Sequence, residues 1–155
     1  MLIGIISDTH GLLRPQAIAA LAGSDFIIHA GDIGDPSILD RLNQIAPLTA
    51  VRGNVDRGAW GAKIPTTNVL EAAGVSIYVL HELDRLDLKP EVSGFAAVIY
   101  GHSHQPGQET RNGVLYFNPG SAGPRRFRLP VTVGKLSVRG PELLAEVVDL
   151  LGTSH

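Results

Sequence analysis

The 155-residue sequence contains no cysteine and few aromatic residues, and its basic side chains do not outnumber the acidic ones. Without cysteine, disulfides and thiolate metal sites are excluded. With 13 Lys and Arg against 15 Asp and Glu, the surface lacks the positive charge needed for coating nucleic acid or binding an anionic membrane. One Trp and three Tyr provide no visible platform for stacking nucleobases. We therefore expect no broad nucleic-acid surface and no membrane partner.

A long apolar run is also missing near the N-terminus. The run from Leu2 to Ile6 ends at Ser7, which is too short for a signal-peptide core or a membrane span. We therefore expect the mature protein to begin at Met1 and to be cytoplasmic. The length, with no linker or low-complexity segment, predicts a single domain over residues 1–155.

The remaining apolar residues are arranged in two successive patterns. The first part alternates strands at Leu2–Ile6, Phe26–His29 and Leu48–Val51 with helices at Pro15–Ala22 and after a cap at Asp35, which is typical of a parallel sheet covered by helices. Further strands follow at Asn68–Leu70, Val75–Leu80 and Ala96–Tyr100, and Asn112-Gly113 predicts a hairpin between Gln108–Arg111 and Val114–Phe117. Val131–Val138 indicates a strand broken by Gly134, and Leu143–Leu151 fits either a strand or a helix. We predict an α/β fold of two stacked mixed β-sheets flanked by helices, a four-layer α/β/β/α sandwich.

Seven side chains that can bind metal come immediately after these predicted strands in the sequence. They are Asp8, His10, Asp32, Asn54, His81, His102 and His104. Because ligands bind at the carboxyl ends of strands in open α/β sheets, we expect them to meet at one edge. Oxygen and imidazole ligands suit divalent transition metals, and we expect Mn²⁺ first, with Fe²⁺, Zn²⁺, Co²⁺ or Ni²⁺ as alternatives. Seven ligands suffice for two ions if one carboxylate bridges them, and the resulting positive charge favours an anionic substrate such as a phosphate ester.

Each of these signals has a simpler explanation when it is taken alone. An Asp-x-His pair such as Asp8 and His10 would arise about 0.3 times in a shuffled sequence, whereas Gly101-His102-Ser103-His104 would arise only about 0.03 times. His29 lies inside a predicted strand and is better explained as a packed histidine than as a ligand. The cluster around Arg125 is either a solvated loop or a phosphate-binding group, and we assign Arg125 to substrate binding.

Taken together, the motifs resemble those of the calcineurin-like metallophosphoesterases, particularly their small prokaryotic phosphodiesterase branch. The matching segments are Ser7-Asp8-Thr9-His10-Gly11, Gly31-Asp32, Gly53-Asn54-Val55-Asp56, His81, Gly101-His102-Ser103-His104 and Asn118-Pro119-Gly120-Ser121. The resemblance implies that Asp8, His10 and His104 hold one metal, that Asn54, His81 and His102 hold the other, and that Asp32 bridges them. It implies hydrolysis of phosphate esters, with phosphodiesters foremost, by attack of a metal-bridging hydroxide, with Asp32 and Asn54 as catalytic groups and Asn54 also contacting the substrate.

Two positions depart from that family pattern. Val55 stands where many members have a histidine that can protonate the leaving group, and Glu82 replaces the usual glycine after His81. Glu82 must either point away from the site or help to orient a ligand.

One alternative comes from another functional class. A protein-interaction scaffold on the same fold, with or without metal, would resemble the small subunit of the eukaryotic retromer coat, whose metal site is degraded. All seven ligand positions are intact here, which favours the enzyme. We expect a small phosphate-ester substrate, and the sequence leaves the oligomeric state, including a homo-oligomer, open.

Overall fold

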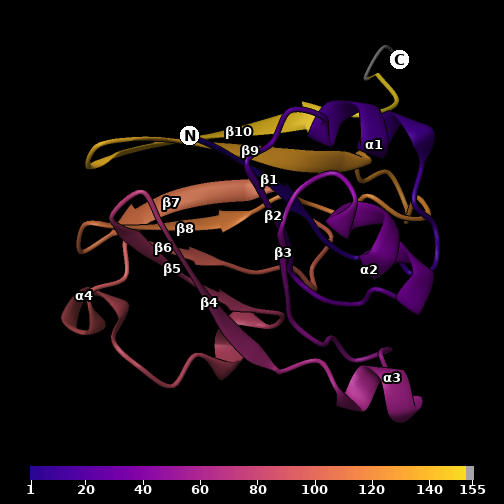
Figure 1. Ribbon diagram of the computed structural model, residues 1–155, viewed down its shortest axis with the longest axis horizontal. Coiled ribbons are helices and arrows are strands. Elements are labelled where there is room, and N and C mark those ends of the chain that lie inside the picture. The colour runs from indigo at the N-terminus through magenta and orange to yellow at the C-terminus, as the bar shows by residue number, and fades with distance from the viewer. Residues whose placement is uncertain (153–155) are drawn as a thin grey trace.

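A computed structural model describes residues 1–152 and places their ten strands in two five-stranded sheets (Figure 1). The strand order is β10-β9-β1-β2-β3 in the first sheet and β4-β5-β6-β8-β7 in the second. Each sheet contains both parallel and antiparallel pairs. The two stacked mixed sheets expected from the sequence are therefore confirmed.

The first sheet is built mostly from the N-terminal part of the chain. Its strands are β1 (Leu2–Ile6), β2 (Phe26–His29), β3 (Leu48–Ala50), β9 (Thr132–Arg139) and β10 (Glu142–Asp149). Helices α1 (Pro15–Leu21) and α2 (Pro36–Asn43) pack on one face, and the Asp35 side chain accepts a hydrogen bond from the backbone N–H of Ser37 at 2.9 Å. The predicted helix cap at Asp35 is thus present, as a carboxylate satisfying a first-turn amide.

The second sheet contains the predicted hairpin. Its strands are β4 (Thr67–Ala72), β5 (Val75–Leu80), β6 (Ala97–Ile99), β7 (Gly107–Arg111) and β8 (Val114–Asn118). Asn112 and Gly113 join β7 to β8 with φ values of 52° and 78°, as a two-residue hairpin turn requires. Short helices α3 (Gly58–Ala62), η1 (Leu83–Arg85) and α4 (Pro90–Ser93) lie in the connections, so the helical layer outside this sheet is thin.

Two expectations about the C-terminal region are settled by the structure. Gly134 does not break its strand, because β9 runs without interruption from Thr132 to Arg139. A Cβ at Gly134 would lie 2.5 Å from the ring of Phe117, so glycine serves close packing between the sheets here. The segment that fitted either a strand or a helix is β10, which pairs with β9 along its full length.

The main apolar core lies between the two sheets and brings their strand ends together. Ile5 and Ile28 of the first sheet pack with Val79, Ile99 and Phe117 of the second, and all five are fully buried. At the carboxyl ends of β1, β2, β5 and β6, the backbone N–H of Asp8 bonds to Gly31 O at 2.9 Å and that of Gly101 to His81 O at 3.0 Å. The backbone N–H of His102 also bonds to Oδ2 of Asp8, across the two sheets, at 3.1 Å, so the loops that follow these four strands converge at one edge. Among the helices of residues 1–152, none has the length and hydropathy to cross a bilayer.

Candidate metal centre

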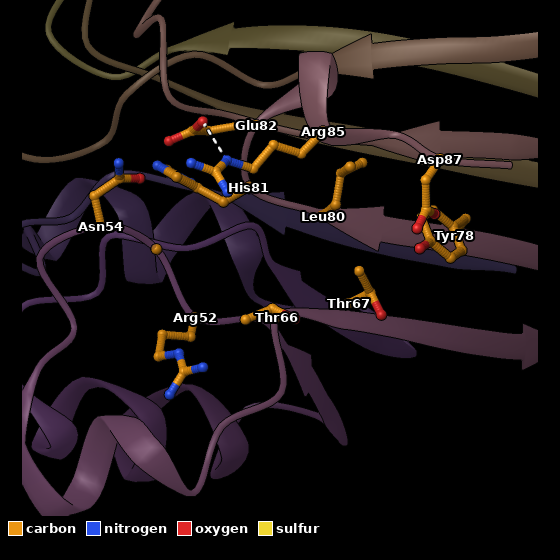
Figure 2. A pocket seen from close by; sticks show the side chains of 11 residues that line it. Arg52, Asn54, Thr66, Thr67, Tyr78, Leu80, His81, Glu82, Arg85 and Asp87 are labelled. Carbon is orange, nitrogen blue, oxygen red and sulfur yellow. Dashed lines mark hydrogen bonds and ion pairs between the residues drawn. The ribbon is translucent and has the colours of Figure 1, made fainter.

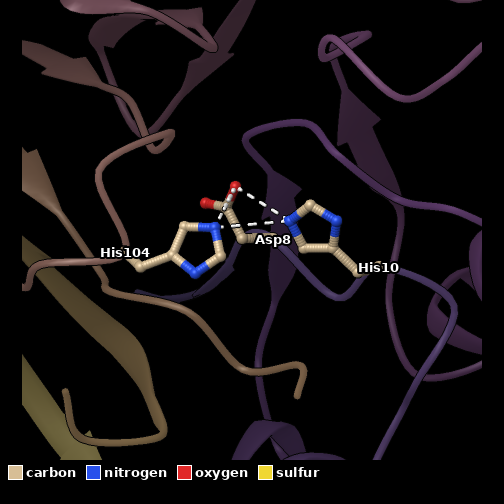
Figure 3. A group of neighbouring side chains, drawn as sticks. All are labelled: Asp8, His10 and His104. Carbon is tan, nitrogen blue, oxygen red and sulfur yellow. Dashed lines mark hydrogen bonds and ion pairs between the residues drawn. The ribbon is translucent and has the colours of Figure 1, made fainter. Parts of the chain in front are cut away.

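Six of the seven predicted ligands form two compact groups at this edge. One group consists of Asp8, His10 and His104 (Figure 3), and the other of Asp32, His81 and His102. In each group, one nitrogen or carboxylate oxygen from every residue lies within 4.8 Å of the others. Each group could hold one metal ion.

The two groups adjoin each other through their carboxylates. Oδ2 of Asp32 lies 3.1 Å from Nε2 of His81 and 3.6 Å from Nε2 of His10, which belongs to the other group. Oδ1 of Asp8 lies 3.4 Å from Nε2 of His104 and 3.9 Å from Nε2 of His81. A carboxylate oxygen thus stands between histidines of both groups, which is the arrangement that a bridging ligand needs.

The other oxygen of each carboxylate is held by the protein. Oδ2 of Asp8 accepts hydrogen bonds from the Ser7 hydroxyl at 2.7 Å and from the backbone N–H of His102 at 3.1 Å. Oδ1 of Asp32 accepts one from the backbone N–H of Val55 at 3.0 Å. These bonds orient Oδ1 of Asp8 and Oδ2 of Asp32 toward the histidines.

Both carboxyl groups are ionised in this environment. Burial raises the pKa of Asp8, but its electrostatic interactions with His10 and His104 outweigh burial and bring the pKa well below its usual range. Burial likewise opposes ionisation of Asp32, and its interactions with His81 and Val55 lower its pKa overall. Two negative charges in a largely buried site call for compensating positive charge.

Buried atoms without hydrogen-bond partners show that a cation fits between the groups. Within residues 1–152, Oδ1 of Asp8 and Nε2 of His81 are buried and accept or donate no hydrogen bond. Nδ1 of His81 lies 2.7 Å from the carbonyl oxygen of Ala30, which assigns a proton to Nδ1 and leaves Nε2 free to coordinate. The Nε2 atoms of His10 and His104 lie 3.3 Å apart. One metal ion in each group would satisfy these atoms, so the residues fit the metals that their chemistry implies.

The backbone is strained at the same residues. Five candidate ligands have positive φ angles, namely Asp8 (55°), His10 (46°), Asp32 (57°), His102 (75°) and His104 (62°). Such conformations cost about 1 to 3 kcal/mol each in non-glycine residues and persist only where the surroundings enforce them. Strain of this kind gathers at functional sites, and here it turns the side chains of consecutive loops toward one point.

Two glycines make room for the ligands. Gly31 has a φ of 103°, and a Cβ there would lie 2.6 Å from Nδ1 of His81. A Cβ at Gly53 would overlap the backbone nitrogen and Oδ1 of Asp32. The glycines in Gly31-Asp32 and Gly53-Asn54 are therefore required by close approach of the ligand loops.

The seventh predicted ligand, Asn54, lies beside the second group in the wall of a cavity of about 610 Å³ that it shares with His81 and Glu82 (Figure 2). Glu82 points toward the site: its Oε2 accepts a hydrogen bond from Nε of Arg85 at 3.0 Å, and its Oε1 lies 3.8 Å from Nδ1 of His102. The Asn54 amide and the Arg85 guanidinium lower the pKa of Glu82. Of the two orientations considered for Glu82, the structure thus shows the one that faces a ligand.

Two other residues singled out in the sequence lie apart from the ligand groups. His29 is fully buried with both ring nitrogens hydrogen bonded, to the Thr9 hydroxyl at 3.0 Å and to the backbone N–H of Gly31 at 3.1 Å, as expected for a packed histidine. Arg125 lines a different hollow of about 290 Å³, and its Nε donates to Leu129 O at 3.2 Å. Its assignment to substrate binding stays a prediction.

One structural residue was missed in the sequence. The buried carboxylate of Asp56 accepts backbone hydrogen bonds from Ile33 at 3.1 Å, Gly34 at 2.9 Å and Gly53 at 2.9 Å. It thereby ties the loop carrying Asp32 to the turn carrying Asn54. The sequence signal for this role was an acidic residue three positions after a glycine, where its carboxylate can accept a hydrogen bond from the backbone N–H of the turn.

Comparison with known proteins agrees with this geometry. Residues 1–140 match a family model described as the calcineurin-like phosphoesterase superfamily domain. A probable metallophosphoesterase of Methanocaldococcus jannaschii is 38% identical over 152 residues, which cover 89% of this chain and 76% of the relative. A solved archaeal phosphodiesterase superposes with a TM-score of 0.79 at 26% identity, covering 96% of this chain and all of that one. Vps29 from Entamoeba histolytica, described as a complex with Zn²⁺, shares the fold with a TM-score of 0.73 at 19% identity, over 97% of this chain and 99% of its own.

Proposed function

Because the chain belongs to the calcineurin-like phosphoesterase superfamily, we propose that it is a single-domain, dimetal-dependent phosphodiesterase acting on small phosphate esters. One observation carries the proposal: buried, ionised Asp8 and Asp32 direct an oxygen each toward the Nε2 atoms of histidines from both ligand groups. In this proposal Asp8, His10 and His104 would hold one ion, Asn54, His81 and His102 would hold the other, and Asp32 would serve both. The archaeal structural relative described as a phosphodiesterase supports the choice of diesters.

Two bound divalent cations, which we propose to be Mn²⁺, would polarise a phosphoryl oxygen and supply a nucleophile from water at neutral pH. The protein's own residues orient the reaction. The Asn54 side chain has a carbonyl oxygen for a metal and N–H groups for a phosphoryl oxygen, whereas a carboxylate at this position would repel the substrate. Val55 positions Asp32 through its backbone N–H, and its own side chain, 45% exposed, donates no proton.

The alternative function is a protein-interaction scaffold. It is considered because proteins named Vps29 have the same fold. Metal content alone does not separate the two functions, because one Vps29 structure is itself described as a complex with Zn²⁺. Hydrolysis has to be measured. The cytoplasmic location and the lack of a broad nucleic-acid surface stay predictions from the sequence, which leaves the oligomeric state open.

The test compares Asp32→Ala with Asp40→Ala, a matched removal of an exposed carboxylate on α2. We expect two metal ions per chain in the wild type by elemental analysis and hydrolysis of bis-p-nitrophenyl phosphate with Mn²⁺. Asp32→Ala should lose metal and more than about 100-fold in rate, since even outer-sphere changes cost about 10- to 100-fold. Asp40→Ala should behave as wild type. Full hydrolysis after exhaustive chelation, or in Asp32→Ala, would contradict the proposal.

A further inference from the structure

The cavity beside the second ligand group extends well beyond the metal centre. Asn54 and Glu82 stand at one end, Tyr78 and Asp87 stand at the other, and Thr67 lies between them (Figure 2). Its volume of about 610 Å³ is within the range of about 300 to 1,000 Å³ that is typical of small-molecule sites. A phosphate group bound at Asn54 would therefore leave most of the cavity for the organic group that it esterifies.

The walls of this cavity are preformed. Tyr78 and Leu80 are buried residues of β5, and the Tyr78 ring packs against Phe95 with centroids 5.1 Å apart. Thr67 on the neighbouring strand β4 pairs with Leu80, so it continues the same sheet surface, and the loop before Thr67 is held by a 2.8 Å hydrogen bond from Arg52 N to Pro65 O. Little ordering is thus needed when a ligand enters.

Most of the side chains that line the cavity are polar, and their formal charges cancel. Glu82 and Asp87 contribute two negative charges, and Arg52 and Arg85 contribute two positive ones. Glu82 and Arg85 are paired at 3.0 Å, and within the described chain Asp87 is engaged in no ion pair. A neutral lining of this kind favours neither a further phosphate nor a cationic group.

The remaining lining groups suit hydroxyl ligands. Thr66, Thr67 and Tyr78 each carry a hydroxyl that both donates and accepts hydrogen bonds, and Asp87 is a carboxylate acceptor. Leu80 is the single aliphatic residue larger than glycine among the residues that line the cavity. A purely apolar group would leave these polar side chains without partners, which is unfavourable.

We propose that this cavity is a subsite for a neutral, polyhydroxylated organic group, of glycerol or pentose type, attached to the substrate phosphate. The proposal rests on the proposed phosphoesterase function for the placement of the phosphate at the metal centre. Asp87 and Thr67 are its specificity-determining residues, binding the hydroxyls of the ligand, and Tyr78 forms its floor.

The test uses two ligands of equal charge and chain length, glycerol 3-phosphate and n-propyl phosphate, titrated calorimetrically into the Mn²⁺-loaded protein. We expect glycerol 3-phosphate to bind at least about 10-fold more tightly, because two or more hydrogen bonds distinguish the ligands. Asp87→Ala and Thr67→Val should bring that ratio toward 1, because each removes a group that binds ligand hydroxyls. Thr110→Val, an exposed Thr-to-Val change on β7, is the matched control and should keep the wild-type ratio.

Equal affinity for the two ligands in the wild type, or an unchanged ratio in Asp87→Ala with Thr67→Val, would overturn the subsite. Hydrolysis of bis-p-nitrophenyl phosphate by the same preparation separates this result from failure of the proposed function. An active enzyme without ligand preference refutes the subsite alone. A protein that prefers glycerol 3-phosphate but hydrolyses no ester refutes the phosphoesterase function and keeps the subsite.

Discussion

We expect buried His29 to make the stability of this protein sensitive to acid. Its Nδ1 accepts the backbone N–H of Gly31 at 3.1 Å, so the proton resides on Nε2 and is donated to the Thr9 hydroxyl at 3.0 Å. That hydroxyl in turn donates to Ile33 O at 2.8 Å. A second proton on Nδ1 would break the bond to Gly31, the residue next to Asp32.

The sign and size of the effect follow from the pKa of His29. Burial lowers this pKa from 6.5 to about 4, even though the nearby carboxylates Asp8 and Asp56 raise it. Between these two pH values the unfolded chain binds a proton that the folded chain does not, so stability is complete above about pH 6.5 and falls as the pH decreases. At about 1.4 kcal/mol per pKa unit, His29 alone removes about 2 to 3 kcal/mol of the free energy of unfolding by pH 4.5.

The assay is urea unfolding of metal-free wild type and His29→Gln at pH 7.0, 6.0, 5.0 and 4.5. Asp8, Asp32 and His81 are present in both proteins, so their titration cancels when the two free energies of unfolding are subtracted. We expect the wild type to lose about 2 to 3 kcal/mol more than His29→Gln over this range. An NMR titration of the folded wild type should also show a neutral His29 ring down to about pH 5. Parallel stability profiles, or a ring that titrates near pH 6.5, would refute the reasoning.

Three further predictions concern residues around the metal centre. Asp56→Asn should lower the free energy of unfolding by about 2 to 3 kcal/mol in urea, because one amide oxygen cannot accept three buried N–H groups, whereas Asp40→Asn should leave it unchanged. Val55→His should raise the hydrolysis rate for alkyl diesters by about 100-fold or more relative to aryl diesters, since a positioned acid assists poor leaving groups. A wild-type rate that does not depend on the pKa of the leaving group would contradict this prediction. Glu82→Gln should weaken binding of the second Mn²⁺ by about 10- to 100-fold, by loosening His102; equilibrium dialysis showing wild-type affinity would exclude this role.

Local sequence patterns were enough to predict the structure where one physical effect dominates. The Asn112-Gly113 turn needs two positive φ angles, and few other residue pairs supply them, so the hairpin was predictable. Buried strands such as Phe26–His29 appear as short apolar runs because both faces of the sheet are covered. The placement of candidate ligands directly after such strands predicted their convergence, since parallel strands end at a common edge.

Strand pairing decided the secondary structure where the local sequence pattern left it open. Leu143–Leu151 fits a helix or a strand by itself, and becomes β10 because β9 offers a full ladder of backbone hydrogen bonds. Gly134 looks like a strand breaker, yet it lies within β9 because it pairs with Ile5 of β1 and Val147 of β10. Glycine is needed there because the ring of Phe117 from the other sheet occupies the space of a side chain. Both outcomes depend on residues distant in the chain, which no local window contains.

The same division holds at the candidate metal centre. The sequence alone predicted the ligand types, because Asp, Asn and His at strand ends are chemically suited to divalent metals. Only the tertiary structure revealed that Oδ2 of Asp32 stands between His10 and His81, that Glu82 faces His102, and that Arg125 lies in another hollow. The physical reason is that the directions of these side chains are set by strained loops and by hydrogen bonds such as Val55 N to Asp32, which join segments more than twenty residues apart.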